Sequence, residues 1–160
     1  MKIMPYAALL LCFSPCCAES ADFRDSTIIL NGHTANGKDI NVTIENAKLR
    51  DDCDVGRTKM WGGSVDFPAD SHIRNINISI AGDRVFVPMS SYNDLSAART
   101  AKLISSGGGF KVQMSGADAG LSWNATIGVA LDHVQERKVC SGEFPDYCEK
   151  TVYPPPISDR

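Results

Sequence analysis

Residues 121–153, LSWNATIGVALDHVQERKVCSGEFPDYCEKTVY, decide the fold class. Apolar or small side chains occupy every second position from Trp123 to Leu131, and mostly polar residues fill the positions between them. This alternation is typical of a strand with one buried and one solvent-facing side. A second extended segment follows at 134–140, and a short turn leads into a third at 147–153. We therefore expect a β-meander at this end of the chain.

Two cysteines flank the turn of this meander. Cys140 and Cys148 are separated by seven residues that include a glycine and a proline, a span that can reverse the chain and place two strands side by side. An oxidising compartment favours a disulfide between them, which would contribute about 2–3 kcal/mol by the chain-entropy estimate. Cys53 is then free, or it pairs with one of the two and leaves the other unpaired.

The alternation of apolar and polar residues recurs earlier in the chain. Strands are expected at 27–30, 39–45, 72–80, 84–87, 100–104 and 110–114. The turn signals between them include Asn31-Gly32, Asn36-Gly37 and the glycine-rich tip at 107–109. Residues 90–99 form the best helix candidate, with Ser90 or Ser91 as the N-cap. The expected fold is mainly β, an antiparallel β-sandwich or barrel of about eight strands with one short helix.

The first residues have the pattern of an export signal. Residues 1–18 carry one lysine and a short apolar run, followed by small residues. The run is shorter than the roughly twenty apolar residues that span a bilayer, so we expect cleavage after residue 18. The alternatives are a buried N-terminal segment of the domain and a lipid anchor on Cys16 or Cys17. The expected organisation is a signal peptide at 1–18, one β domain at 19–153 and a proline-rich tail at 154–160.

Composition narrows the class of partner. The chain has 16 basic and 19 acidic residues and a formal net charge of −3. This balance gives no basic stripe of the kind that nucleic-acid binding requires. No segment after the leader is apolar enough to be expected to span a membrane. We expect a periplasmic or secreted protein whose partner is another protein.

No motif in the sequence identifies a reaction, a cofactor or a metal. His33, His72 and His133 are far apart in the chain, and neither a zinc-ligand spacing nor a G-x-S-x-G elbow is present. Cys53 has aspartates around it, which raise the pKa of a thiol and disfavour a nucleophilic role. The acidic group at 51–54 is best interpreted as a solvated loop, because the spacing of a calcium loop is incomplete. A His/Asp cluster formed in space, as in a small hydrolase or metal-dependent enzyme, remains an alternative function.

The C-terminal motifs of the chain resemble motifs that other proteins share. The chain has Glu136-Arg137-Lys138-Val139, then Ser141-Gly142-Glu143-Phe144-Pro145, then Glu149, Thr151 and Tyr153. In this series it resembles a group of small exported bacterial proteins of unassigned function that share E-R-x-V, S-G-E-F-P and E-x-T-x-Y. The resemblance extends loosely to 87–90 and 116–119. It implies an exported bacterial β domain and assigns no site.

Two interpretations of the hairpin tip remain open. Arg137 with Glu143 and Glu149 can form ion pairs that fix the last turn. The other interpretation makes Glu143, Phe144 and Pro145 a contact for a partner, because a rigid exposed tip suits recognition. The leading hypothesis is an exported, non-enzymatic binding protein of the inhibitor or immunity type that acts through its loops. A structural component of the envelope is a further alternative.

Overall fold

The computed structural model describes residues 20–22, 27–49, 59–96, 98–106, 109–130 and 132–155. These residues form ten strands and two short 3₁₀ turns: β1 Ser20–Asp22, β2 Thr27–His33, β3 Asp39–Lys48, β4 Ser71–Ile80, β5 Asp83–Val85, η1 Met89–Ser91, β6 Ala98–Ser106, β7 Gly109–Gly116, η2 Ala119–Leu121, β8 Trp123–Val129, β9 Val134–Ser141 and β10 Cys148–Val152. The strands form a six-stranded sheet in the order β1-β6-β7-β8-β9-β10 and a four-stranded sheet in the order β2-β3-β4-β5.

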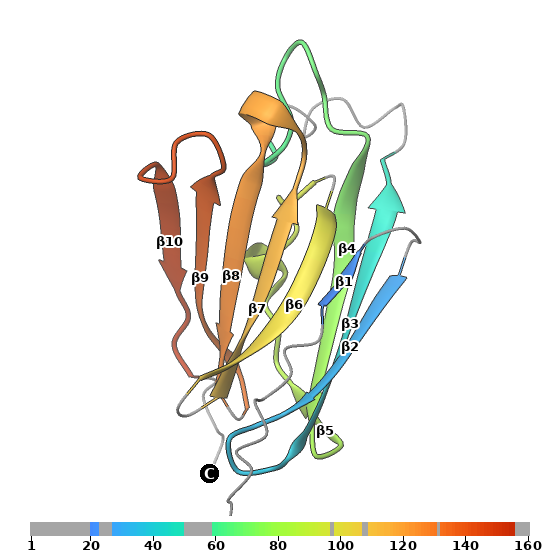
Figure 1. Ribbon diagram of the computed structural model, residues 1–160, viewed down its shortest axis with the longest axis vertical. Helices are drawn as coiled ribbons and strands as arrows, with labels where there is room; N and C mark the ends of the chain where they lie inside the picture. Colours follow the sequence, from blue (N-terminus) through green and yellow to red (C-terminus); the bar gives the residue numbers. More distant parts are fainter. Residues whose placement is uncertain are drawn as a thin grey trace, which may run out of the picture.

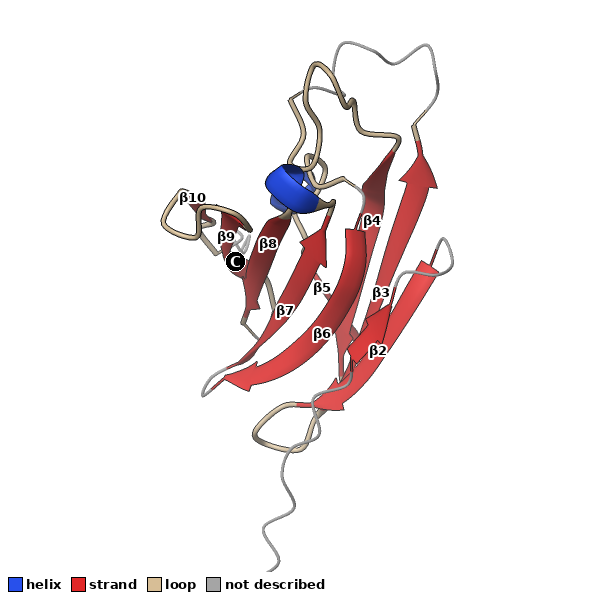
Figure 2. Ribbon diagram, turned by 45° about the horizontal axis from the view of Figure 1, so that its top comes forward, coloured by secondary structure: helices blue, strands red, loops and turns tan. Residues whose placement is uncertain are grey.

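The two sheets are separate layers of an antiparallel sandwich (Figures 1 and 2). The fold-class prediction is therefore confirmed, with the sandwich as the correct one of the two expected architectures. The meander predicted at 121–153 is β8, β9 and β10, which are neighbours in the larger sheet.

The core fills the space between the layers because alternation places one side of each strand inward. In the smaller sheet, Ile40, Val42 and Ile44 of β3 lie opposite Ile80, Ile78 and Ile76 of β4, and all six are buried. In the larger sheet the inward side chains of β8 include Trp123 and Ile127, which are almost fully buried. Each strand thus contributes its apolar positions to one shared core.

A crossing segment, residues 86–96, joins the two sheets beside β4 and β9. Phe86 pairs with His133 in the turn before β9, and the Ile73 amide of β4 donates to the carbonyl of Leu95. Leu95 is fully buried, and the indole nitrogen of Trp123 donates to the Ser96 carbonyl over 2.9 Å. The segment therefore has partners in both layers.

The helix predicted at 90–99 is wrong apart from one turn. Only Met89–Ser91 is helical, as a 3₁₀ turn, and its Ser91 hydroxyl donates to the carbonyl of Pro88. Leu95 pairs with Trp61, and β6 begins at Ala98. Long-range pairing of an extended chain has replaced the local helical preference.

One predicted turn is also wrong. Asn31-Gly32 lies inside β2, where Gly32 pairs with Ile40 of β3. The chain reverses at Asn36-Gly37 instead, where Gly37 has a φ of 75° and donates its amide to the carbonyl of Thr34. The second turn signal is therefore the one that forms this hairpin.

Several predictions fall outside the described residues. These are the leader at 1–18, the acidic group and cysteine at 51–54, Leu131, the hairpin tip at 107–108 and the tail from 156 onward. Within the described part of the chain, none of the helical turns has the length and apolar character required to cross a bilayer.

Candidate functional site

The C-terminal hairpin presents two aromatic side chains at its tip. Cys140 of β9 lies directly opposite Cys148 of β10, and the two sulfurs are bonded, so the predicted disulfide is confirmed. The tip is ordered by hydrogen bonds from the Ser141 amide to the Tyr147 carbonyl and from the Phe144 amide to the Ser141 hydroxyl, 3.0 and 3.1 Å long. The Phe144 and Tyr147 side chains are exposed, at 64% and 70%. The hairpin therefore holds a large apolar surface in water.

Two other loops lie at the same end of the sandwich, residues 59–70 and 117–122 (Figure 1). The Gly142 amide of the hairpin donates to the Ser122 carbonyl over 2.7 Å, which ties the second loop to the tip. Trp61 of the first loop donates its amide to the Asp94 carbonyl and accepts from the Ser96 amide. All three loops are thus anchored to neighbouring parts of the fold.

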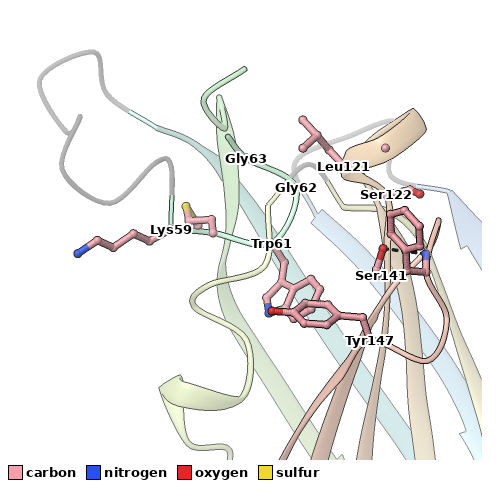
Figure 3. Close-up of a pocket in the computed structure, with 11 residues that line it drawn as sticks. Lys59, Trp61, Gly62, Gly63, Leu121, Ser122, Ser141 and Tyr147 are labelled. Atoms are coloured by element: carbon pink, nitrogen blue, oxygen red, sulfur yellow. Dashed lines mark hydrogen bonds between the residues drawn. The ribbon is translucent and has the colours of Figure 1, made fainter. Parts of the chain in front are cut away.

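An open cleft of about 400 Å³ lies between these loops. We call it the loop-end cleft. The rings of Trp61 and Tyr147 are 6.3 Å apart between centroids and inclined at 47° (Figure 3). The lining consists of Lys59, Met60, Trp61, Gly62, Gly63, Gly120, Leu121, Ser122, Ser141, Phe144 and Tyr147. Its character is aromatic and apolar, with two serines and one lysine.

Glycines allow the loops to pack this closely. A Cβ on Gly62 would lie 2.7 Å from the Ser96 hydroxyl oxygen and 2.9 Å from the Cβ of Ala117. A Cβ on Gly142 would lie 2.3 Å from the Ser122 hydroxyl oxygen. Real Cβ atoms do not approach other atoms this closely. The walls of the cleft are therefore set by contacts that a larger residue would break.

The predicted contact residues reach this site only in part. Glu143, Phe144 and Pro145 are all exposed on the hairpin tip, and Phe144 lines the cleft. Trp61 and Tyr147, which form the aromatic pair, were not predicted as site residues. They are far apart in the sequence, and no local pattern connects them.

Arg137 forms one of the ion pairs expected around the last turn and a second one with a residue that was not predicted. Arg137 is 2% exposed, and its Nη1 donates to Glu149 over 2.6 Å, as expected. Its Nη2 donates to both carboxylate oxygens of Asp94 in the crossing segment, also over 2.6 Å. Glu143 has no place in this network, and its inclusion was wrong. Asp94, Arg137 and Glu149 form what we call the buried ion-pair network.

The histidines are placed on three separate elements. The Nδ1 of His33, at the end of β2, lies 2.9 Å from the Asp39 carboxylate. The buried His133 pairs with the adjacent Asp132 over 2.6 Å, and His72 stands on β4. Among the described residues, no group of three or more His, Cys, Asp or Glu side chains is placed to hold a metal ion. The structure thus places the three histidines apart from one another, each on its own element.

A second cleft, of about 420 Å³, lies between β4, β5 and the crossing segment. Burial raises the pKa of the Tyr92 phenol in its wall above the usual range. On the neighbouring strands, a hydrogen bond from Arg74 lowers the pKa of the Glu45 carboxyl. Two polar residues of the lining are also engaged with protein neighbours, because Asn75 donates to Glu45 and Arg84 donates to Asn77.

The disulfide is expected to stabilise both the fold and the tip. Replacing Cys140 and Cys148 together by serine should lower the free energy of unfolding by about 2–3 kcal/mol, because a short closed loop is opened in the unfolded chain. Hydrogen exchange should become faster at the Gly142 and Tyr147 amides, whose bonds hold the tip. Urea unfolding and exchange measured by NMR would check both effects. Unchanged exchange at these amides would show that the hydrogen bonds alone order the tip.

In comparisons with known proteins, the chain matches no protein-family model, no curated protein and no solved structure.

Proposed function

We propose that this chain is an exported, non-enzymatic binding protein of the inhibitor or immunity type. It recognises another protein through the loop-end cleft. The observation that carries the proposal is the exposure of Phe144 and Tyr147 beside Trp61 at one end of the molecule. Exposed aromatic side chains around a hollow are typical of the residues that contribute most to protein recognition.

The anchoring of the loops supports the same function. The tip is bounded by a disulfide and tied to the neighbouring loop by the bond from Gly142 to Ser122. A contact surface ordered before binding loses less conformational entropy when the partner arrives. This favours tight recognition by rigid loops. The bonded cysteines also support a place of action outside the reducing cytosol.

A photo-crosslinker placed in the cleft tests the proposal. Benzoyl-phenylalanine at position 144 retains an aromatic ring there, and the same residue at position 29 serves as the control. Ile29 is 56% exposed on β2, in the other sheet. Both variants would be irradiated in an extract of the compartment in which the protein is found.

We expect an adduct of defined mass from position 144 and none of that mass from position 29. An excess of unlabelled wild-type protein should compete with it, and an excess of the Tyr147→Ser variant should compete poorly. Tyr147 is exposed, so this substitution removes binding surface without opening the core. Identical adducts from the two positions, or none from position 144, would refute recognition through the cleft.

A further inference from the structure

The three described loops around the cleft contain more acidic than basic residues. The loops at 59–70, 117–122 and 141–147 contain the acidic residues Asp66, Asp70, Asp118, Glu143 and Asp146. All five are exposed, and Lys59 is the one basic residue in these described loops. Asp118 pairs with Arg99 of β6. The described loops around the cleft therefore have more acidic than basic side chains.

Two of these acids belong to the same hairpin tip as Phe144 and Tyr147. Glu143 and Asp146 lie on the hairpin tip, on either side of Phe144 and Pro145. The Glu143 carboxylate lies against Gly120 of the cleft wall, with Oε2 2.9 Å from the position that a Cβ would take there. Lys59, by contrast, extends away from Trp61 and Tyr147 (Figure 3). The charged group that lies against the cleft wall is therefore the Glu143 carboxylate, next to Gly120.

Aromatic rings and carboxylates together select a cation. The face of a tryptophan or tyrosine ring attracts a positive charge, and Arg forms such contacts more often than Lys. The planar guanidinium stacks on aromatic rings and binds carboxylates through two parallel hydrogen bonds. The compact ammonium of lysine has no planar face and no such pair of parallel donors. The inclined rings of Trp61 and Tyr147 offer a flat group a surface of this kind.

We propose that the loop-end cleft binds an arginine of a basic segment in the partner protein. The guanidinium stacks against Trp61 and Tyr147 and faces the carboxylates of Glu143 and Asp146. This inference rests on the proposed function and adds the chemistry of the partner to it. The formal net charge of −3 of the whole chain also favours a basic partner over an acidic one.

Two peptides that differ only in charge provide the probe. Fluorescein-labelled decapeptides of glycine and serine would carry two central arginines or two central citrullines, which match arginine in shape and lack its charge. Fluorescence anisotropy with the whole protein, at about 50 mM salt, is expected to give about tenfold tighter binding of the arginine peptide. Raising the salt to about 0.5 M should remove most of this difference.

A pair of matched variants separates the site from the overall charge. Glu143→Gln with Asp146→Asn should weaken binding of the arginine peptide about tenfold and leave the citrulline peptide unchanged. Asp39→Asn with Asp83→Asn makes the same change in net charge. It lies at the opposite end of the sandwich, near the turn between β4 and β5 (Figure 1). This control should alter binding less than about twofold.

The outcomes distinguish this inference from the proposed function. Equal binding of the two peptides, or equal weakening by both double variants, would overturn the arginine site. If a specific adduct still formed at position 144, recognition of a partner through the cleft would stand without it. Tight binding of the arginine peptide with no protein adduct at position 144 would support a site for basic peptides and refute the proposed protein partner.

Discussion

Removal of the Asp94 carboxylate is expected to destabilise the fold more than removal of the arginine that it binds. Asp94→Ala leaves Arg137 almost fully buried with Glu149 as its remaining partner. A buried charge that loses a partner is costly, so we expect a loss of about 3 kcal/mol in the free energy of unfolding. Arg137→Met leaves carboxylates whose side chains are 34% and 52% exposed. Water can solvate them, and the expected loss is about 1–2 kcal/mol.

The double variant makes this asymmetry measurable. Asp94→Ala combined with Arg137→Met removes the buried charge together with its main partner, so it should be more stable than Asp94→Ala alone. Urea unfolding followed by tryptophan fluorescence would give the three values. A double variant less stable than both single variants would show that packing, and not charge, determines the loss.

An exposed ion pair on the same two strands serves as the control. Lys150 of β10 lies 2.8 Å from Glu136 of β9, with side chains 57% and 36% exposed. The hydrogen bond from Lys150 lowers the pKa of the Glu136 carboxyl below its usual range. Lys150→Met should nevertheless change the free energy of unfolding by less than about 1 kcal/mol, because surface ion pairs contribute little.

Gly62→Ala is expected to destabilise the fold strongly, because the backbone conformation and the surrounding atoms both disfavour a side chain there. Gly62 has a φ of 90°, where a side chain costs about 1–2 kcal/mol. The new methyl group would also lie 3.0 Å from the indole nitrogen of Trp123 and closer still to Ser96 and Ala117. Overpacking typically adds about 1–3 kcal/mol, so the expected total is about 3 kcal/mol. The neighbouring Trp61 should move with its loop, and binding at the cleft should weaken as well.

Gly37→Ala measures how much stability is lost through the backbone conformation alone. Gly37 has a similar φ of 75°, but no atom lies within 4 Å of the position of its Cβ. The same substitution there should cost about 1 kcal/mol. Thermal unfolding of both variants would measure the difference. Equal losses would mean that the contacts around Gly62 relax at no cost.

The local alternation of apolar and polar residues was sufficient to predict most of the strands. Alternation identified β3, β4 and β8, because each strand has one side in the core. The C-terminal hairpin and its disulfide also follow from residues close in sequence. The alternation of apolar and polar residues did not predict the extended chain at Leu95 and Ser96. The serines before them are typical N-cap residues, and they favoured the prediction of a helix. There the pairing partners are Trp61 and His72, which the local sequence does not reveal.

The candidate site was predicted less well for the same reason. Phe144 could be predicted as a contact residue because it lies in a tight turn, where side chains are exposed. Tyr147 contacts Trp61 of a loop far away in the sequence, and Arg137 meets Asp94 across 43 residues of sequence. Glu143 was expected in the ion pairs because it is close in sequence, whereas the folded chain brings Asp94 to that position. Long-range partners of this kind have no signature in residue spacing.

The backbone of the cleft and its exposed surface depend on different residues. The glycines at 62 and 142 fix the backbone, whereas Phe144 and Tyr147 project from it into solvent. Substitutions at the two exposed aromatic positions should therefore change the surface of the tip at little cost to folding. Substitutions at the two glycines should instead disturb the backbone that holds this surface in place.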